Sequence, residues 1–199
     1  MPLGAFKAGL MGAAGASAGA DVVLLSTQTA SDSASLSFTS DIDSTYGEYI
    51  FKFYNLNPAT DSASFTFQVN IVGEDGYNDV AINSVQFQSY HEDGTSGGDA
   101  SSFGVRDNSL DNEASYQILK DEIGNGTAEQ ASGEMHLFNP ASTTYAKHFF
   151  SRIVSYNPSD NIEDAITAGY LNEGGAVDDV QFKMSSGNFD GKIQMWGVK

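Results

Sequence analysis

Apolar residues recur at every second position through most of this chain from residue 21 to its end, and this period restricts the fold more than any other feature. Successive side chains of a strand point to opposite faces, so such alternation is typical of strands with one buried face. Residues 65–71 are the clearest case, since Phe, Phe, Val and Ile alternate there with Thr, Gln and Asn. We expect one face of that strand to lie in water.

The spacing of these runs and of the turn signals between them predicts an all-β fold, a jelly-roll-like antiparallel β-sandwich of about ten to twelve strands. Beyond residue 20, only residues 111–120 leave room for one helical turn. Residues 48–56 are apolar on both faces, which favours a central strand. Tight turns are expected at 57–60 and 139–143, where Asn precedes Pro, and a long exposed loop at 93–102. The predicted strands lie within 22–25, 36–38, 48–56, 65–71, 85–90, 116–119, 134–138, 145–156, 166–171, 177–184 and 192–198.

The first twenty residues differ from the rest of the chain in composition. They contain five Gly, seven Ala, the single charge of Lys7 and no acidic residue. The Gly residues interrupt the apolar run, and the charge follows apolar residues, so a secretion signal or a membrane span is disfavoured. We therefore predict two parts, an arm of residues 1–20 and a β domain of residues 21–199.

The arm is expected to be extended or to form a short helix. Its large apolar side chains are three or four residues apart, which would place them on one helical face. We predict that they form an interface with a neighbouring subunit; packing of the arm against its own domain is the alternative. These residues are Leu3, Phe6, Leu10 and Met11.

Charge and cysteine content exclude several classes of protein. Nine Lys and Arg stand against 26 Asp and Glu, for a formal charge of −17. Such a chain repels nucleic-acid phosphates and anionic lipid, so we expect no nucleic-acid or membrane partner. The absence of cysteine excludes disulfides, Cys-ligated zinc and iron–sulfur clusters, and it fits folding in a reducing cytoplasm.

Motifs of catalysis and cofactor binding are missing from the sequence. His136 and His148 are expected on adjacent antiparallel strands, where Glu134 would complete a metal site, but no HxH or HExxH spacing occurs. The chain has no G-x-S-x-G and no phosphate-binding loop. We predict no enzyme activity, no metal and no cofactor. Two acidic sets, Asp75, Asn78 and Asp79, and Asp107, Asp111 and Glu113, are better interpreted as solvated loops than as Ca²⁺ sites.

Three aromatic residues are candidate stacking platforms for a carbohydrate, Tyr77, Tyr90 and Trp196. Aromatic rings at the surface of a β-sandwich can stack on sugar rings. Trp196 lies in the last predicted strand, where a core or interface position is favoured over a ligand site.

Over its whole length the chain resembles a group of structural proteins of marine tailed phages, such as cyanophages and pelagiphages. The resemblance rests on several stretches taken together, residues 4–9, 42–46, 57–61, 65–67, 89–91, 136–143, 168–170, 182–188 and 191–197. It implies a structural component of a virion, but no stretch is a catalytic motif.

This resemblance leads to an expected function and location. The chain is expected to be a capsid decoration protein or a fibre component of a tailed phage, assembled in the host cytoplasm and located on the virion. Its expected partners are further copies of itself, as a trimer, and capsid or tail proteins, contacted through the arm. The alternative is a lectin-like module that binds a host surface glycan.

Overall fold

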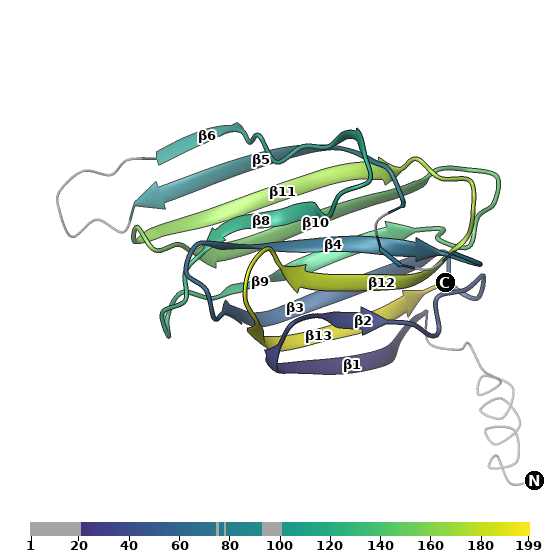
Figure 1. Cartoon of the computed structure of the whole chain (residues 1–199), viewed down its shortest axis with the longest axis horizontal. Helices are drawn as coiled ribbons and strands as arrows, with labels where there is room; N and C mark the ends of the chain where they lie inside the picture. Colours follow the sequence, from purple (N-terminus) through teal and green to yellow (C-terminus); the bar gives the residue numbers. More distant parts are fainter. Residues whose placement is uncertain (1–20, 75, 78, 93–100) are drawn as a thin grey trace, which may run out of the picture.

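A computed structural model describes residues 21–74, 76–77, 79–92 and 101–199, and every regular element within them is a strand (Figure 1). The strands form two antiparallel sheets that pack face to face, so the predicted all-β sandwich is confirmed. The predicted arm, residues 1–20, lies outside the described residues. Within the described part, no helix is long and apolar enough to cross a membrane.

Thirteen strands are present in the described part of the chain. They are β1 (Val22–Ser33), β2 (Leu36–Phe38), β3 (Glu48–Pro58), β4 (Ala63–Ile71), β5 (Ile82–Glu92), β6 (Ser101–Val105), β7 (Asp111–Glu113), β8 (Gln117–Ile123), β9 (Ala131–Phe138), β10 (Lys147–Tyr156), β11 (Asn161–Leu171), β12 (Val177–Met184) and β13 (Phe189–Val198).

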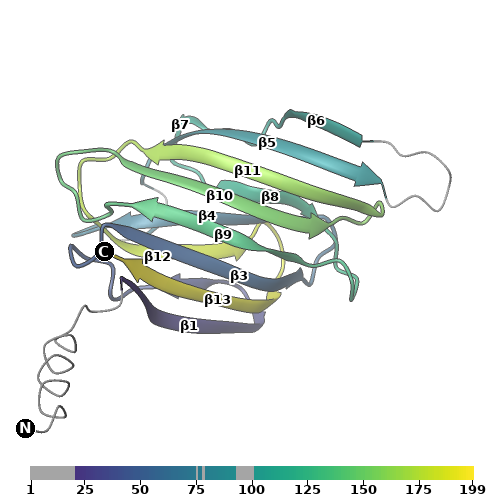
Figure 2. The ribbon, with the colours of Figure 1, turned by 180° about the vertical axis from the view of Figure 1, so that it is seen from behind.

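The two sheets differ in size. The large sheet has the order β1-β13-β3-β9-β10-β11-β5-β6, with β7 also paired to β5, and it faces the viewer in Figure 2. The small sheet has the order β2-β12-β4-β8 and covers one side of the large sheet. Among the residues that the structure describes, no second sheet covers the other side of the large sheet.

Aromatic side chains from both sheets fill the space between them. Phe182 of β12 lies at the centre, with ring centroids 5.2 Å from Phe51 and Phe53 and 5.7 Å from Phe65. Phe67 of β4 meets Phe149 of β10 at 4.9 Å. All six of these rings are almost fully buried. Burying each would contribute on the order of 1.5–3 kcal/mol, so this cluster is a main source of stability.

The expected central strand at residues 48–56 is β3, which pairs with β13 on one side and β9 on the other. Its alternation changes at Asn55, which has φ of 50° and interrupts the register between Phe53 and Leu56. An inserted residue of this kind returns the next side chain to the same face. Leu56 is thus fully buried, rather than lying on the outer face with Ile50 and Tyr54 as we expected.

The prediction of a wet face on residues 65–71 is wrong. In β4 the polar residues Thr66, Gln68 and Asn70 are buried like their apolar neighbours. Other chain segments cross this face, and the Gln68 amide donates to the carbonyl oxygens of Val80 (3.1 Å) and Ser115 (2.9 Å). Polar side chains can be buried when they are hydrogen-bonded in this way.

Residues 111–120 contain no helical turn, which corrects that expectation. Asp111–Glu113 forms β7 at the edge of β5, and Gln117–Ile123 forms β8 at the edge of the small sheet. Pairing with existing sheets therefore decided the conformation of this stretch. The Asn-Pro turn predicted at 139–143 is present, since the Ser142 N–H donates to the Asn139 carbonyl oxygen at 3.0 Å. The turn predicted at 57–60 is displaced, because Asn57 and Pro58 still pair with β13 as the last residues of β3, and the chain turns at residues 59–62.

We predict that Phe182→Ala lowers the free energy of unfolding by about 3–5 kcal/mol, because it leaves a cavity where several rings meet. Chemical denaturation followed by circular dichroism would measure this loss. Phe103→Ala is the matched control, since Phe103 is 70% exposed and its loss should cost less than about 1 kcal/mol. Similar losses in the two variants would contradict a central role for Phe182.

Candidate functional site

The uncovered side of the large sheet is unusually apolar, and we call it the aromatic face. It consists of the outward side chains of β1, β13, β3, β9, β10, β11, β5 and β6. Most of the large hydrophobic residues that the structure leaves exposed lie on it: Val22, Leu24, Tyr54, Val85, Phe103, Val105, Phe150, Val154, Ile162, Ile166 and Tyr170. Contiguous apolar surface of this kind marks an interaction site more often than scattered exposed residues do.

The strand register places the side chains of this face in rows across the sheet. One row runs from Leu24 through Trp196, Ile50, His136, Phe150 and Ala168 to Val85. These residues come from sequence positions far apart and meet only because seven strands are paired in this order.

Aromatic stacking organises the middle of the face. The His136 ring lies flat on Phe150, with centroids 4.3 Å apart and an interplanar angle of 11°. Phe138 lies 6.0 Å from Phe150, and at the far edge Phe87 stacks on Phe103 at 5.8 Å. Such contacts hold the rings in fixed orientations, so the face is preorganised for contact.

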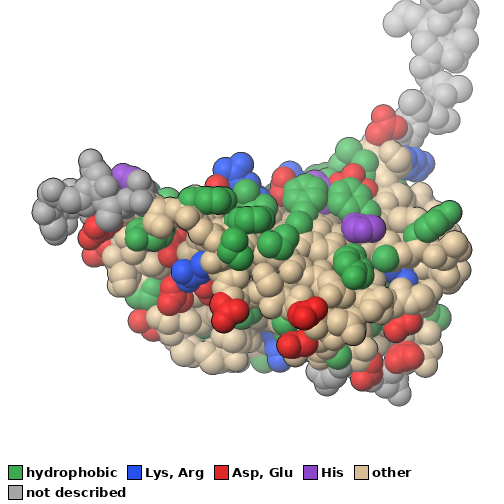
Figure 3. Space-filling view, turned by 90° about the horizontal axis from the view of Figure 1, so that it is seen from above, with side chains coloured by type: hydrophobic (Ala, Val, Ile, Leu, Met, Phe, Trp, Pro, Cys, Tyr) green, Lys and Arg blue, Asp and Glu red, His purple; other side chains and the backbone are tan. Residues whose placement is uncertain are grey.

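The aromatic face is nearly neutral, although the chain carries a formal charge of −17. The ion pairs across it are Lys52–Glu134 at 3.6 Å and Arg152–Asp164 at 2.7 Å, and Glu48 is hydrogen-bonded to His136 at 2.5 Å. Lys192 adds a cation over the Tyr54 ring, 4.8 Å from its centroid. Figure 3 shows hydrophobic and histidine side chains along this side of the molecule, with acidic side chains mainly toward the other.

Shallow hollows cross the face between these rows. One is lined by Lys52, Tyr54, Ser132, Arg152 and Val154, together with neighbouring residues of β3 and β9. Another lies beside Val85 and Tyr170. They are open depressions rather than enclosed clefts, so this surface suits a flat partner better than a small buried substrate.

The three predicted stacking aromatics do not form one platform. Trp196 is half-buried on the aromatic face in β13. Tyr77 lies beside Ser37, Asp179 and Tyr116, on the side of the small sheet. Tyr90 belongs to β5 but points opposite to the outward Ser89 and His91, because successive side chains alternate. The structure therefore separates the residues that the sequence suggested as a group.

The predicted adjacency of the two strand histidines is confirmed. β9 and β10 pair so that His136 lies opposite Phe150. His148, two residues before Phe150 in β10, points to the same face of the sheet. Glu134 lies 3.4 Å from His136, but no group of three His, Asp or Glu in the described residues converges to hold a metal. Asp75 and Asn78 lie outside the described residues. Asp107, Asp111 and Glu113 form no such group either.

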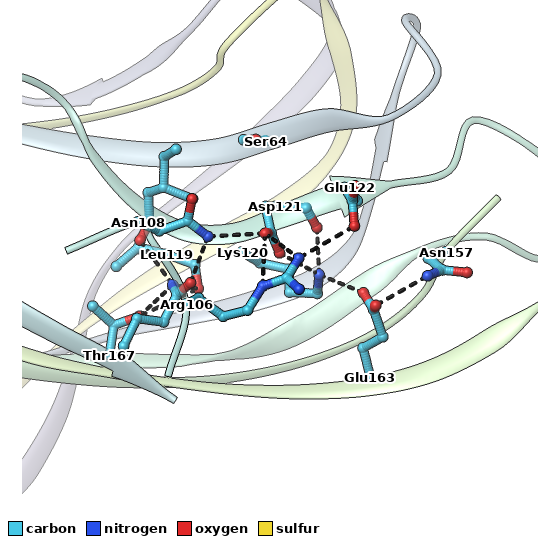
Figure 4. A network of polar contacts seen from close by, with 12 residues as sticks. Ser64, Arg106, Asn108, Leu119, Lys120, Asp121, Glu122, Asn157, Glu163 and Thr167 are labelled. Atoms are coloured by element: carbon cyan, nitrogen blue, oxygen red, sulfur yellow. Dashed lines mark hydrogen bonds and ion pairs between the residues drawn. The ribbon is translucent and has the colours of Figure 1, made fainter. Parts of the chain in front are cut away.

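A second candidate site is a buried polar cluster between β8 and the large sheet (Figure 4). The ammonium group of Lys120, fully buried, lies 2.6 Å from Glu163 and 3.0 Å from Asp121. Arg106 donates to Asp121 at 2.7 Å, and Asn157 donates to Glu163 at 2.9 Å. These contacts pair both buried carboxylates with cations, as buried charges require.

The electrostatics of the cluster indicate a structural role. Burial alone would raise the pKa of Asp121, but Lys120 and the hydrogen bonds from Arg106 and Asn108 outweigh it and lower this pKa from 3.8 to about 2. A general acid or base works best with a pKa near the working pH. Asp121 is therefore suited to holding β8 in place rather than to transferring protons at neutral pH.

Comparisons with known proteins assign no family. No protein-family model matches the chain, and no curated protein matches it. A Bacteroides ovatus protein of unknown function is similar at 11% identity and a TM-score of 0.20, over 71% of this chain and 46% of that one. The catalytic domain of a Thermotoga maritima laminarinase is similar at 12% identity and a TM-score of 0.25, over 89% and 77%. Similarity this weak assigns neither fold nor activity.

The length covered differs between these two structures. This chain spans less than half the length of the Bacteroides ovatus protein and about three quarters of the laminarinase domain. What either protein binds or does is therefore not carried over to this chain.

Sequence reasoning missed the aromatic face and the buried cluster. A signal for the face was present, because neighbouring residues such as Phe149 and Phe150 point to opposite sides, and both are apolar. The signal for the cluster was the adjacent opposite charges of Lys120 and Asp121 directly after the apolar Ile118 and Leu119. Neither pattern reveals its partners, which come from strands distant in sequence.

We predict that Asp121→Asn lowers the free energy of unfolding at pH 7 by about 2–3 kcal/mol, the equivalent of the pKa shift. The folded-state pKa is below the unfolded one, so this contribution is present above about pH 4 and is lost as the pH falls toward 2. Urea denaturation at several pH values would measure it.

Glu122→Gln is the matched control, because Glu122 also contacts Arg106, at 3.3 Å, but has a largely exposed side chain. Its loss should change stability by less than about 1 kcal/mol at any pH. A gap between wild type and Asp121→Asn that stays constant from pH 7 to pH 2 would refute this assignment.

Proposed function

We propose that this chain is a non-catalytic structural protein of a tailed-phage virion, a capsid decoration protein or a fibre component. The observation that carries the proposal is the aromatic face, a preorganised and nearly neutral surface on an otherwise acidic chain. Such a surface is suited to lasting contact with another surface. The sequence resemblance to structural proteins of marine tailed phages supplies the kind of particle.

The fold supports this proposal in a general way. Double-sheet sandwiches recur in capsid components, where they provide rigid surfaces for contact. Here the large sheet is supported from behind by the aromatic cluster around Phe182, so its outer side chains are held by a rigid layer. A fold alone does not assign a function, however, and the chemistry of the surface carries more weight.

The arrangement of ionisable groups supports a role without catalysis. Carboxylates of the described residues are paired with cations both inside the sandwich and on the aromatic face. These pairs are Glu163 with Lys120, Glu134 with Lys52 and Asp164 with Arg152. The hollows of the face are open to solvent, whereas enzymes usually place reacting groups in a water-excluded site.

Carbohydrate binding is the second candidate function, and the hollow beside Tyr54 favours it. Tyr54 exposes part of its ring there, and Lys52, Glu134 and Arg152 supply donors and acceptors at its rim. A ring beside polar groups is the usual arrangement for holding a sugar. In this function the chain would be a lectin-like module for attachment to a host surface glycan.

The first experiment is mass spectrometry of purified particles of the phage that encodes this sequence. We expect the chain in each particle at a fixed copy number, retained through density-gradient purification. A chain that is made in infected cells but absent from the purified particles would overturn the proposed location.

For the second candidate, glycan-array binding of the full chain is the measurement. If the hollow holds a sugar, Tyr54→Ala should weaken binding at least about tenfold, because a stacked ring contributes on the order of 1–2 kcal/mol. Tyr145→Ala is the matched control, since Tyr145 is exposed on the turn before β10, away from the hollow. Equal loss in both variants, or no glycan bound at all, would exclude this function for the hollow.

A further inference from the structure

We infer that the partner of the aromatic face is the aromatic face of a second copy of this chain, so that two sandwiches pair through their large sheets. This inference deepens the proposed function and rests on it, because assembly of a virion component would bring copies of the chain together. Its physical basis is separate, and it comes from the charge, the extent and the shape of the face.

Charge is the first reason. Two copies, each with a formal charge of −17, repel one another over most of their surfaces. On the aromatic face, Glu134 and Asp164 are paired with Lys52 and Arg152, and Glu48 is hydrogen-bonded to His136. Lys192 adds a third cation over the Tyr54 ring. Because these cations balance the acidic groups in number, two such faces can meet with little repulsion. A strongly basic partner, by contrast, would find no excess of negative charge here.

Extent is the second reason. Eight paired strands about 4.8 Å apart span roughly 34 Å across the sheet, and seven residues along every strand except the shorter β6 span about 23 Å. The footprint is therefore on the order of 800 Å² per copy, which is the usual share of one partner in a stable protein–protein interface. A short peptide or a single sugar would leave most of this apolar surface in water.

Shape is the third reason. Outward side chains of a twisted sheet form ridges and shallow grooves, and two such surfaces can interdigitate at about 10 Å between sheets. The stacked rings of His136 and Phe150 form a ridge, and the hollows beside Tyr54 and Tyr170 form the grooves. Pairing of one face with itself about a two-fold axis closes the assembly at two copies, in place of the trimer expected from the sequence.

The test uses the full chain and measures its mass by light scattering across a range of concentrations. We expect a dimer that dissociates on dilution. Val154→Glu should weaken the dimer about a hundredfold or more, because it adds a negative charge and a desolvation cost to each copy of the interface. Val72→Glu is the matched control with the same change of charge; Val72 is 61% exposed in the loop after β4 and should leave dimerisation unchanged.

Trp196 provides an independent readout, because it is the single tryptophan of the chain and lies on the aromatic face. Its emission should shift to longer wavelength as dilution exposes the face, over the same concentrations at which the mass falls. Circular dichroism and thermal unfolding of each variant show whether the sandwich is intact. Should Val154→Glu fail to fold, the dilution-dependent shift of Trp196 in the wild-type chain still tests the inference.

Several results would overturn the pairing. These are a wild-type monomer at all concentrations, equal effects of Val154→Glu and Val72→Glu, and mass changes without a shift of Trp196. A full chain carrying Leu3→Ser, Phe6→Ser and Leu10→Ser that no longer associates would identify the first twenty residues as the contact instead. A dimer with the expected behaviour, but absent from purified particles, would leave the pairing standing and overturn the virion role.

Discussion

The contact between the two sheets depends on Phe182, whose ring meets Phe51, Phe53 and Phe65 between β12, β3 and β4. Because these strands come from distant parts of the chain, neither sheet can bury its inner side chains until the other is in place. The alternation of apolar residues makes this packing feasible, since it collects the rings on one side of each strand. The packed core then holds the large sheet as a rigid layer, and the backbone positions of its outward side chains are fixed with it.

Buried polar groups also determine how the two sheets pack together. The small sheet does not offer a uniformly apolar surface near β8, where the fully buried Lys120 contacts Asp121 and Glu163. Lys147, also fully buried, donates to the carbonyl oxygens of Glu173 and Gly175. Each of these cations is stable only with its partners present, so the cluster fixes how β8 sits on the large sheet.

The aromatic face and the buried cluster illustrate two opposite uses of charge. In the cluster, cations pair with buried carboxylates and hold β8 against the large sheet. On the face, cations cancel carboxylates at the surface, so an acidic chain presents one side on which another molecule can rest. This balance supports contact with a protein surface more than contact with a nucleic acid or a small substrate, which would need a basic surface or an enclosed cleft.

The alternation by itself determined that the chain is a β-sandwich, where most of its strands lie, and that His136 and His148 lie on neighbouring strands. What covers each face was decided only by the tertiary structure. Alternation at every second residue indicates which side chains share a face of a strand. It does not indicate whether water, another strand or a loop covers that face. Gln68 therefore occupies a position that the alternation assigns to solvent, yet it is fully buried, because the carbonyl oxygens of Val80 and Ser115 accept its hydrogen bonds. The aromatic face arose in the same way, since the small sheet packs on only one side of the large one.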